Sequence, residues 1–165
     1  MHFVWQDVVR DYELDYQGIV NNSNYLRYME HARHQHLVAL GVDFAKLHEL
    51  GTDLVLVSSQ INFKNSLRSG DHYIVTSDFS LEGRIRFKTT QQIMRASDQL
   101  LIAEGEHICV AISTDTRRPK RFDALTQKIL DNTSVPPLGT RLHTSNSTTR
   151  NAISTTIGAL IQEVM

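Results

Sequence analysis

The hydrophobic pattern begins as a strand and then becomes a helix. Over residues 3–10, apolar and β-branched side chains alternate with others as they do in a strand. From Ser23 to Leu40 the apolar spacing is helical, and Gly41 is a typical stop signal. The double Asn before Ser23 is suited to capping the start of this helix. Its predicted buried stripe holds Tyr25, Met29, Ala32, His36, Ala39 and Leu40, and the opposite stripe holds Arg27, His31 and His34.

The pattern then changes to that of a sheet. After a second helical piece at residues 43–49, four strand-like runs follow, at residues 54–63, 72–81, 84–96 and 100–113. Short turn-forming clusters separate the last three runs, and such short connections favour antiparallel hairpins. The chain is therefore predicted to be α+β, with one long central helix wrapped by an antiparallel sheet of about five strands.

The C-terminal part of the chain has a different composition. Residues 123–130 allow a short final helix, whereas residues 132–149 are rich in Thr, Ser, Pro and Asn, which is typical of a linker. Residues 151–164 regain helical apolar spacing. We expect a folded domain at 1–131, followed by a polar linker and tail at 132–165, whose last residues have the spacing of a short helix.

Composition narrows the classes of partner. The 165 residues include 17 basic and 18 acidic side chains, a balance that does not favour nucleic acid. No apolar run approaches the roughly 20 residues needed to cross a membrane. A single cysteine, Cys109, cannot form an internal disulfide, and the N-terminus lacks the pattern of a secretion signal. We therefore expect a cytoplasmic protein with neither a nucleic-acid nor a membrane partner.

An acidic loop before the long helix carries the most specific motif. It has the form Asp-x-x-Gly-x-Val, beginning at Asp15, and is followed by Asn-x-x-Tyr, ending at Tyr25. This segment resembles the signature of the 4-hydroxybenzoyl-CoA thioesterase-like family of hotdog proteins. It is especially similar to the plastid acyl-lipid thioesterases and their bacterial relatives. The resemblance continues at residues 61–71 and 114–121, and covers roughly residues 3–130.

The resemblance implies a function and a site. It implies a hotdog fold, hydrolysis of an acyl-CoA or acyl-carrier-protein thioester, a role in fatty acid metabolism, and Asp15 as base or nucleophile. The thioester oxygen is expected at the helix start, near the N–H groups of Asn22 and Ser23. Gly18, Val20 and Tyr25 of the motif are further candidates for substrate binding. No separate cofactor is expected, because coenzyme A is part of the substrate. The resemblance also implies a homodimer or homotetramer with its active site between subunits.

The chemistry is consistent with these residue types. Hydrolysis of a thioester needs a carboxylate that attacks or activates water, and donors for the oxyanion. A helix N-terminus supplies unpaired N–H groups and the positive end of the dipole. Two alternatives remain: Asp15 is only a turn residue, or the working carboxylate is Asp11 or Glu13, which share its face in an extended backbone.

Basic side chains offer a second candidate feature. Arg84, Arg86 and Lys88 alternate along one predicted strand and would lie on one face, where they are suited to the phosphates of coenzyme A. A solvated sheet face is an equally good interpretation. Lys64 is a weaker candidate of the same kind.

The histidines and the motif residues also bear on other classes of function. His31, His34 and His36 point in different directions around a helix, so no metal site is expected. A hotdog dehydratase or hydratase needs a histidine soon after the acid, and residues 16–20 contain none, although His107 cannot be placed from sequence. A non-catalytic module that binds acyl-CoA is the remaining alternative.

Overall fold

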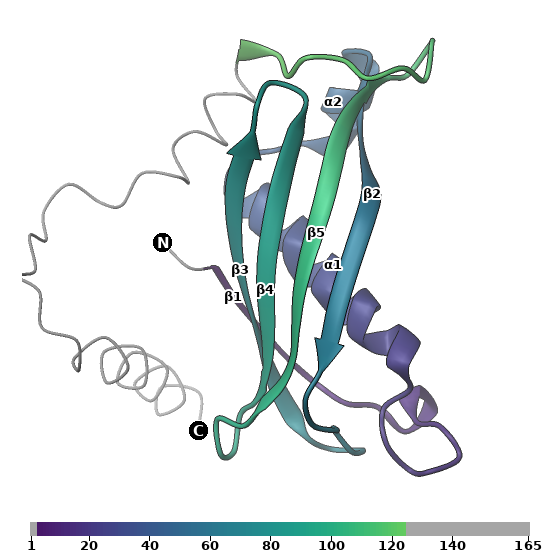
Figure 1. The fold of residues 1–165 in the computed structure, drawn as a ribbon, viewed down its shortest axis with the longest axis vertical. Coiled ribbons are helices and arrows are strands. Elements are labelled where there is room, and N and C mark those ends of the chain that lie inside the picture. The colour runs from purple at the N-terminus through teal and green to yellow at the C-terminus, as the bar shows by residue number, and fades with distance from the viewer. Residues whose placement is uncertain (1–2, 125–165) are drawn as a thin grey trace, which may run out of the picture.

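A curved sheet and one long helix make up most of residues 3–124, the part of the chain described by the computed structural model (Figure 1). In chain order the elements are β1 (Phe3–Val8), η1 (Asp11–Glu13), α1 (Asn22–Ala39), α2 (Phe44–Glu49), β2 (Thr52–Phe63), β3 (His72–Glu82), β4 (Arg86–Arg95) and β5 (Leu101–Ser113). The two helices and five strands predicted within residues 3–113 are therefore present, with boundaries that differ by up to two residues. The short final helix expected at residues 123–130 falls almost wholly outside the described residues. The expected linker and tail at 132–165 lie outside the described residues.

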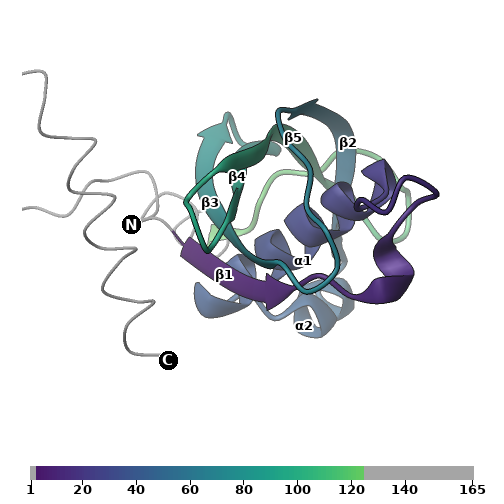
Figure 2. The ribbon, with the colours of Figure 1, turned by 90° about the horizontal axis from the view of Figure 1, so that it is seen from below.

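The sheet is antiparallel throughout and curls around α1 (Figure 2). Its strand order is β1-β3-β4-β5-β2, so β1 and β2 are the two edges. The predicted α+β class, with one helix wrapped by five antiparallel strands, is confirmed. Within residues 3–124, no helix is both long and apolar enough to cross a membrane.

The start of β4 differs from the prediction. The strand begins at Arg86 rather than at Arg84, because a turn at residues 83–85 joins it to β3. Gly83 has a φ of +78°, a conformation that glycine adopts at little cost and that ends the pairing of β3. Arg84 consequently lies in the hairpin turn, and only Arg86 and Lys88 lie on the strand.

The buried face of α1 is wider than the predicted stripe. Tyr25, Met29, Ala32 and His36 are buried as expected, but Ala39 is exposed. The prediction missed further buried positions, which are Asn24, Tyr28, Arg33 and Leu37. The curvature explains the difference, since a helix inside a curled sheet is covered over a larger arc than a helix on a flat one.

Two buried histidines lie between α1 and the sheet, His36 on the helix and His107 on β5. His36 is 5% exposed, and its ring is stacked between Phe3 at 4.8 Å and Phe79 at 4.4 Å. His107 on β5 is fully buried; its Nδ1 is 2.9 Å from the Ser59 hydroxyl. Burial lowers the pKa of each imidazole to about 4, and the charge of Arg33 adds to the effect at His107. Both rings are therefore neutral in the folded protein near pH 7.

We predict that acid weakens the fold through these rings. A histidine whose pKa is about 6.5 unfolded and about 4 folded gives full stability above pH 6.5 and loses it as the pH falls toward 4. Each ring should cost about 1.4 kcal/mol per pH unit within that window. His36→Phe keeps an aromatic ring in the stack, so urea unfolding at pH 7.5, 6 and 5 should show a shallower decline than the parent. Parallel declines in the two proteins would contradict this assignment.

Candidate functional site

Asp15 lies in a tight loop whose ends are held together by backbone hydrogen bonds. Leu14 and Val20 form an antiparallel bridge, and the Asp15 N–H donates to the Ile19 carbonyl at 2.8 Å. The Gly18 N–H donates to the Asp15 carbonyl at 3.0 Å, and Gly18 has a φ of +70°. A side chain at Gly18 would strain this turn, which explains the glycine of the motif.

The Asp15 carboxylate is only partly used by this loop. Its Oδ1 accepts from the Gln17 N–H at 2.8 Å, as a turn aspartate does. Its Oδ2 makes no hydrogen bond within residues 3–124, and the side chain is half-buried. The Oδ1 of Asp15 thus stabilises the turn, and its Oδ2 is available to a substrate or a water molecule.

The start of α1 lies directly after this loop. Asn21 is the N-cap: its side-chain oxygen accepts from the Ser23 N–H at 3.0 Å and from the Ser23 hydroxyl at 2.8 Å. The Ser23 N–H is therefore engaged by the cap. The Asn22 N–H, by contrast, has no acceptor among the described residues. Of the two expected oxyanion donors, Asn22 is the free one, and it lies at the positive end of the helix.

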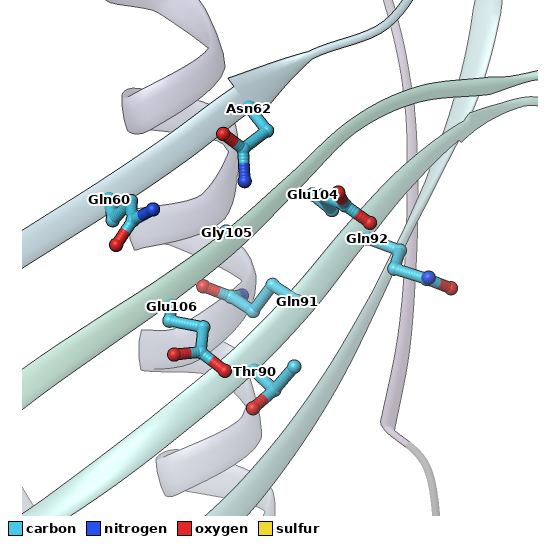
Figure 3. Close-up of a pocket in the computed structure, with 8 residues that line it drawn as sticks. All are labelled: Gln60, Asn62, Thr90, Gln91, Gln92, Glu104, Gly105 and Glu106. Atoms are coloured by element: carbon cyan, nitrogen blue, oxygen red, sulfur yellow. The ribbon is translucent and has the colours of Figure 1, made fainter.

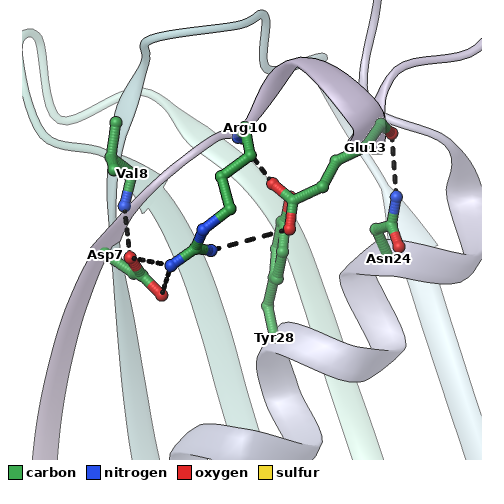
Figure 4. A network of polar contacts seen from close by, with 6 residues as sticks. All are labelled: Asp7, Val8, Arg10, Glu13, Asn24 and Tyr28. Atoms are coloured by element: carbon green, nitrogen blue, oxygen red, sulfur yellow. Dashed lines mark hydrogen bonds and ion pairs between the residues drawn. The ribbon is translucent and has the colours of Figure 1, made fainter.

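Glu13 ties the acidic loop to α1 (Figure 4). Its buried carboxylate accepts from the Arg10 N–H and from the Tyr28 hydroxyl, both at 2.7 Å, and lies 3.7 Å from the Arg10 guanidinium. Its carbonyl accepts from the Asn21 N–H at 2.9 Å and from the Asn24 side chain at 2.8 Å. Burial, followed by the Glu13 bond, raises the pKa of Tyr28 well above its usual value. Glu13 is thus a structural residue: its Oε2 accepts both side-chain hydrogen bonds, and its Oε1 faces the Arg10 guanidinium.

The third carboxylate of the loop is also engaged. Asp11 accepts a hydrogen bond from the Ser69 hydroxyl and is exposed. Among the three acidic side chains considered from sequence, Asp15 alone combines partial burial with a free oxygen. The geometry therefore favours the interpretation of the loop in which Asp15 carries the chemistry.

Two other motif residues support the loop from beneath. Val20 is 1% exposed, and its N–H donates to the Leu67 carbonyl at 2.9 Å. Tyr25 is 2% exposed, and its hydroxyl accepts from the Leu67 N–H at 3.1 Å. Burial raises the pKa of Tyr25. Both side chains pack in the core and join the loop to the segment that follows β2.

Comparison with known proteins assigns the chain to a family. A family model described as the thioesterase-like superfamily matches residues 9–130, well over half of the chain. The chain belongs to the thioesterase-like superfamily. This finding confirms the family expected from the Asp-x-x-Gly motif.

Curated relatives of this superfamily member include plant and bacterial proteins. Acyl-acyl carrier protein thioesterase ATL3 of Arabidopsis thaliana chloroplasts is 33% identical over 109 residues, which is 66% of this chain and 57% of that protein. A putative esterase of Aquifex aeolicus is 33% identical over 105 residues, covering 64% of this chain and 80% of that protein. The chain thus spans a little over half the length of the plant relatives it matches.

Solved structures share the fold. A 1,4-dihydroxy-2-naphthoyl-CoA thioesterase from Synechocystis superimposes with a TM-score of 0.76 at 20% identity, over 82% of this chain and 100% of that one. A Staphylococcus aureus protein solved in complex with CoA gives 0.76 at 16% identity, over 88% of this chain and 96% of that one. The predicted hotdog fold is confirmed.

The basic strand face of this thioesterase-like chain lies far from its own Asp15. The loop follows the end of β1 that is paired with the start of β3, whereas Arg86 pairs with Glu82 at the opposite end of the sheet (Figure 1). The nine residue steps of β4 between Arg86 and Arg95 span about 30 Å. Arg84, Arg86 and Lys88 therefore do not meet Asp15 within one chain.

The two lysines among the candidates pair with glutamates of β5. Lys64 lies 2.9 Å from Glu104, and Lys88 lies 3.3 Å from Glu106. Both glutamates line a polar hollow of about 210 Å³ on the outer face of the sheet, where the side chains of Gln60, Asn62, Thr90 and Gln92 also gather (Figure 3). Exposed pairs of this kind add little stability, so either lysine can exchange its partner for a phosphate at small cost.

The histidines do not assemble into a metal or dehydratase site. His31 contacts Trp5, His34 contacts Phe44, and His36 lies in the aromatic stack, so each faces a different neighbour. Within residues 3–124, no group of three metal-binding side chains comes together. His107 lies on the inner face of β5 with its Nε2 3.3 Å from the Met29 sulfur. It faces α1 rather than Asp15, so the dehydratase alternative lacks its histidine.

We predict that the Glu13 bond to α1 contributes measurably to stability. Tyr28→Phe removes the hydroxyl donor while keeping the ring that stacks on Tyr73 at 4.4 Å. A buried carboxylate that loses one hydrogen bond should cost about 1.5–3 kcal/mol in the free energy of unfolding. Tyr12→Phe is the matched control, because Tyr12 is exposed and should change stability by less than about 0.5 kcal/mol. Equal denaturant midpoints for the two variants would refute the role of this bond.

Proposed function

We propose that the chain hydrolyses an acyl thioester, of coenzyme A or of acyl carrier protein, to the free acid and the thiol. The observation that carries the proposal is the free Oδ2 of Asp15 in a loop that leads directly into a helix start with an unused Asn22 N–H. Membership in the thioesterase-like superfamily supports it. So do the relatives described as acyl-acyl carrier protein thioesterases.

Each group has a defined task in this reaction. The Asp15 carboxylate either removes a proton from water as it attacks the acyl carbon, or attacks that carbon itself and is released by water. The Asn22 N–H and the helix dipole stabilise the negative charge that develops on the thioester oxygen. The carbon–sulfur bond breaks, and the thiolate takes up a proton. The side-chain cap at Asn21 keeps the helix start rigid during these steps.

The free carboxylate also separates this proposal from its alternative. A module that only binds acyl-CoA gains nothing from a half-buried carboxylate with an unused oxygen, because such a group disfavours an ester carbonyl beside it. A hydrolase needs that group. Hydrolysis measured with a free-thiol reagent over a panel of acyl-CoA and acyl-carrier-protein thioesters discriminates the two functions and shows which carrier is used.

We predict that Asp15→Asn removes most turnover and leaves the fold intact. Asn keeps the turn bond from the Gln17 N–H, but cannot accept a proton from water or attack efficiently. The catalytic constant should fall by about 10²–10⁴-fold. Asp11→Asn is the matched control on the same loop and should cost much less. A folded Asp15→Asn protein that hydrolyses its best thioester near the parental rate would overturn the proposal.

We also propose that the working form is at least a homodimer, and a homotetramer on the resemblance to its family. Both β1 and β2 are edge strands within the described residues, and unpaired edges are usually covered or joined. Since Arg84, Arg86 and Lys88 lie toward the end of the sheet opposite to their own Asp15, we place any phosphate contact of theirs at the site of another copy.

We predict that light scattering at micromolar concentration gives a mass of two or four chains.

Arg86→Ala should then raise the Michaelis constant for coenzyme A esters more than it lowers turnover, because a remote phosphate contact contributes equally to ground and transition states. The effect should vanish with a pantetheine substrate that lacks the nucleotide. A fully active monomer would refute the dimer and, with it, the shared site.

A further inference from the structure

The helix α1 carries a buried guanidinium that lacks an acceptor at one nitrogen within residues 3–124. Arg33 is 3% exposed, and its Nη1 makes no hydrogen bond among the described residues. Glu30, one turn earlier, is exposed and forms no ion pair with it, although its charge favours the cation. An arginine stays protonated even when burial lowers its pKa, as it does here. A buried cation without an acceptor is costly, so something outside these residues must supply one.

Arg33 borders a small pocket of mixed character. The pocket is about 70 Å³ in volume and lies between α1, β2 and the start of α2. Leu54, Leu56 and Phe87 supply apolar walls, whereas Glu30, His34 and Cys109 supply polar atoms next to Arg33. A carbon chain that ends in an oxygen acceptor matches both kinds of lining: the carbons meet the apolar walls and the oxygen meets Nη1.

An open flank connects this pocket with the proposed catalytic end of α1. Leu56, Ser59 and Phe63 pair with buried residues of β5 and therefore face inward, yet Leu56 is 40% and Phe63 49% exposed. The inner face of β2 is thus open at Leu56, Ser59 and Phe63, whereas Leu54 and Ile61 on the same face are half-buried against the core. Phe63 contacts Tyr25 at the start of α1, with ring centroids 5.5 Å apart. A chain lying on this face reaches from the Asn22 N–H to the Arg33 pocket.

The helix geometry sets the length of such a chain. Asn22 and Arg33 are eleven residues apart, which is about three turns, so they lie on the same side of α1 and roughly 16 Å apart along its axis. Arginine leans toward the helix N-terminus, which shortens the distance. An extended chain advances about 1.2 Å per bond, so about ten to fourteen carbons bridge the gap.

We propose that the Arg33 pocket recognises an oxygen acceptor at the distal end of the acyl group, such as a hydroxyl, an oxo group or a carboxylate. The inference rests on the proposed thioesterase function and adds a substrate class to it: medium-length acyl groups oxygenated far from the thioester. A hydroxyl fits the surroundings well, because it accepts from Arg33 and can donate to Glu30.

The test compares matched twelve-carbon substrates. Dodecanoyl-CoA, 12-hydroxydodecanoyl-CoA and the mono-CoA ester of dodecanedioic acid differ only at the distal carbon. The parent should hydrolyse at least one of the two oxygenated esters with a kcat/KM about 10–100-fold above that of the plain ester. Arg33→Met keeps the length of the side chain and removes the donor, so it should bring the ratio within a few-fold of one. Arg27→Met, on an exposed arginine of the same helix, should keep the parental ratio.

A binding measurement separates this proposal from the proposed function. Calorimetry with the thioethers S-dodecyl-CoA and S-(12-hydroxydodecyl)-CoA needs no hydrolysis, and the parent should bind the hydroxylated one about 10-fold more tightly while Arg33→Met binds both alike. Discrimination between thioethers without hydrolysis of any thioester would count against the catalytic proposal alone. The substrate proposal would be overturned if the parent preferred the plain chain. It would also be overturned if Arg33→Met and Arg33→Gln both kept the preference for the oxygenated chain.

Two outcomes identify other occupants of the pocket. Removing an unpaired buried cation should leave the melting temperature of Arg33→Met equal to or above that of the parent. A lower melting temperature together with a loss of assembly mass would show that another copy of the chain supplies the acceptor. An unchanged melting temperature without substrate discrimination would show that water alone fills the pocket. Either result refutes the substrate assignment.

Discussion

The geometry of the candidate site depends on one buried carboxylate. Glu13 accepts from the Tyr28 hydroxyl with its side chain and from the Asn21 N–H with its carbonyl, so it connects the loop to two points on the first turns of α1. The bond from Tyr28 is short and buried, which makes it stronger than an exposed pair. The Asp15 loop and the Asn22 N–H are therefore fixed relative to each other before any substrate arrives, and fixed donors cost no reorganisation during the reaction.

The same constraint separates residues that stabilise from residues that react. Glu13 and Asp11 lie within four positions of Asp15, yet Glu13 is buried with its Oε2 bonded to Tyr28, and Asp11 is exposed with its Oδ1 bonded to Ser69. A carboxylate held by donors is a poorer base and nucleophile than a free one, because each donor stabilises the charged form. Of the three acidic groups in this loop, Asp15 alone combines partial burial with an oxygen that has no partner among the described residues.

The sequence predicted the elements better than it predicted their mutual arrangement. Periodicity gave α1, the strands and their antiparallel pairing, because alternation and turn residues are local properties. It did not show that the sheet curls, and so it missed Tyr28, Leu37 and Arg33 as buried residues of α1. Motif resemblance pointed to Asp15, but nothing local distinguished it from Glu13. That distinction depends on Tyr28, fifteen residues later, whose hydroxyl meets Glu13 only in the folded chain. The position of the alternating cations relative to Asp15 could not be predicted for a related reason: sharing a face of β4 does not fix their distance to a loop at the other end of the sheet.

Curvature also accounts for the uneven covering of the sheet. The helix α1 packs against β3, β1 and β4, on one side of the curled sheet, and the opposite edge is left partly open. Here the open edge is β2, whose inward-facing Leu56 and Phe63 remain about half exposed although their cross-strand partners on β5 are buried. An exposed apolar strip beside a free edge strand is unfavourable in isolation, whether it is later covered by a second copy of the chain or by a bound acyl group. The two coverings are compatible, because a second copy joined at the edge of β2 uses its backbone groups and leaves the inner face to the ligand. Under the proposed function, the partly open flank beside the β2 edge is thus the flank on which a long acyl group would lie.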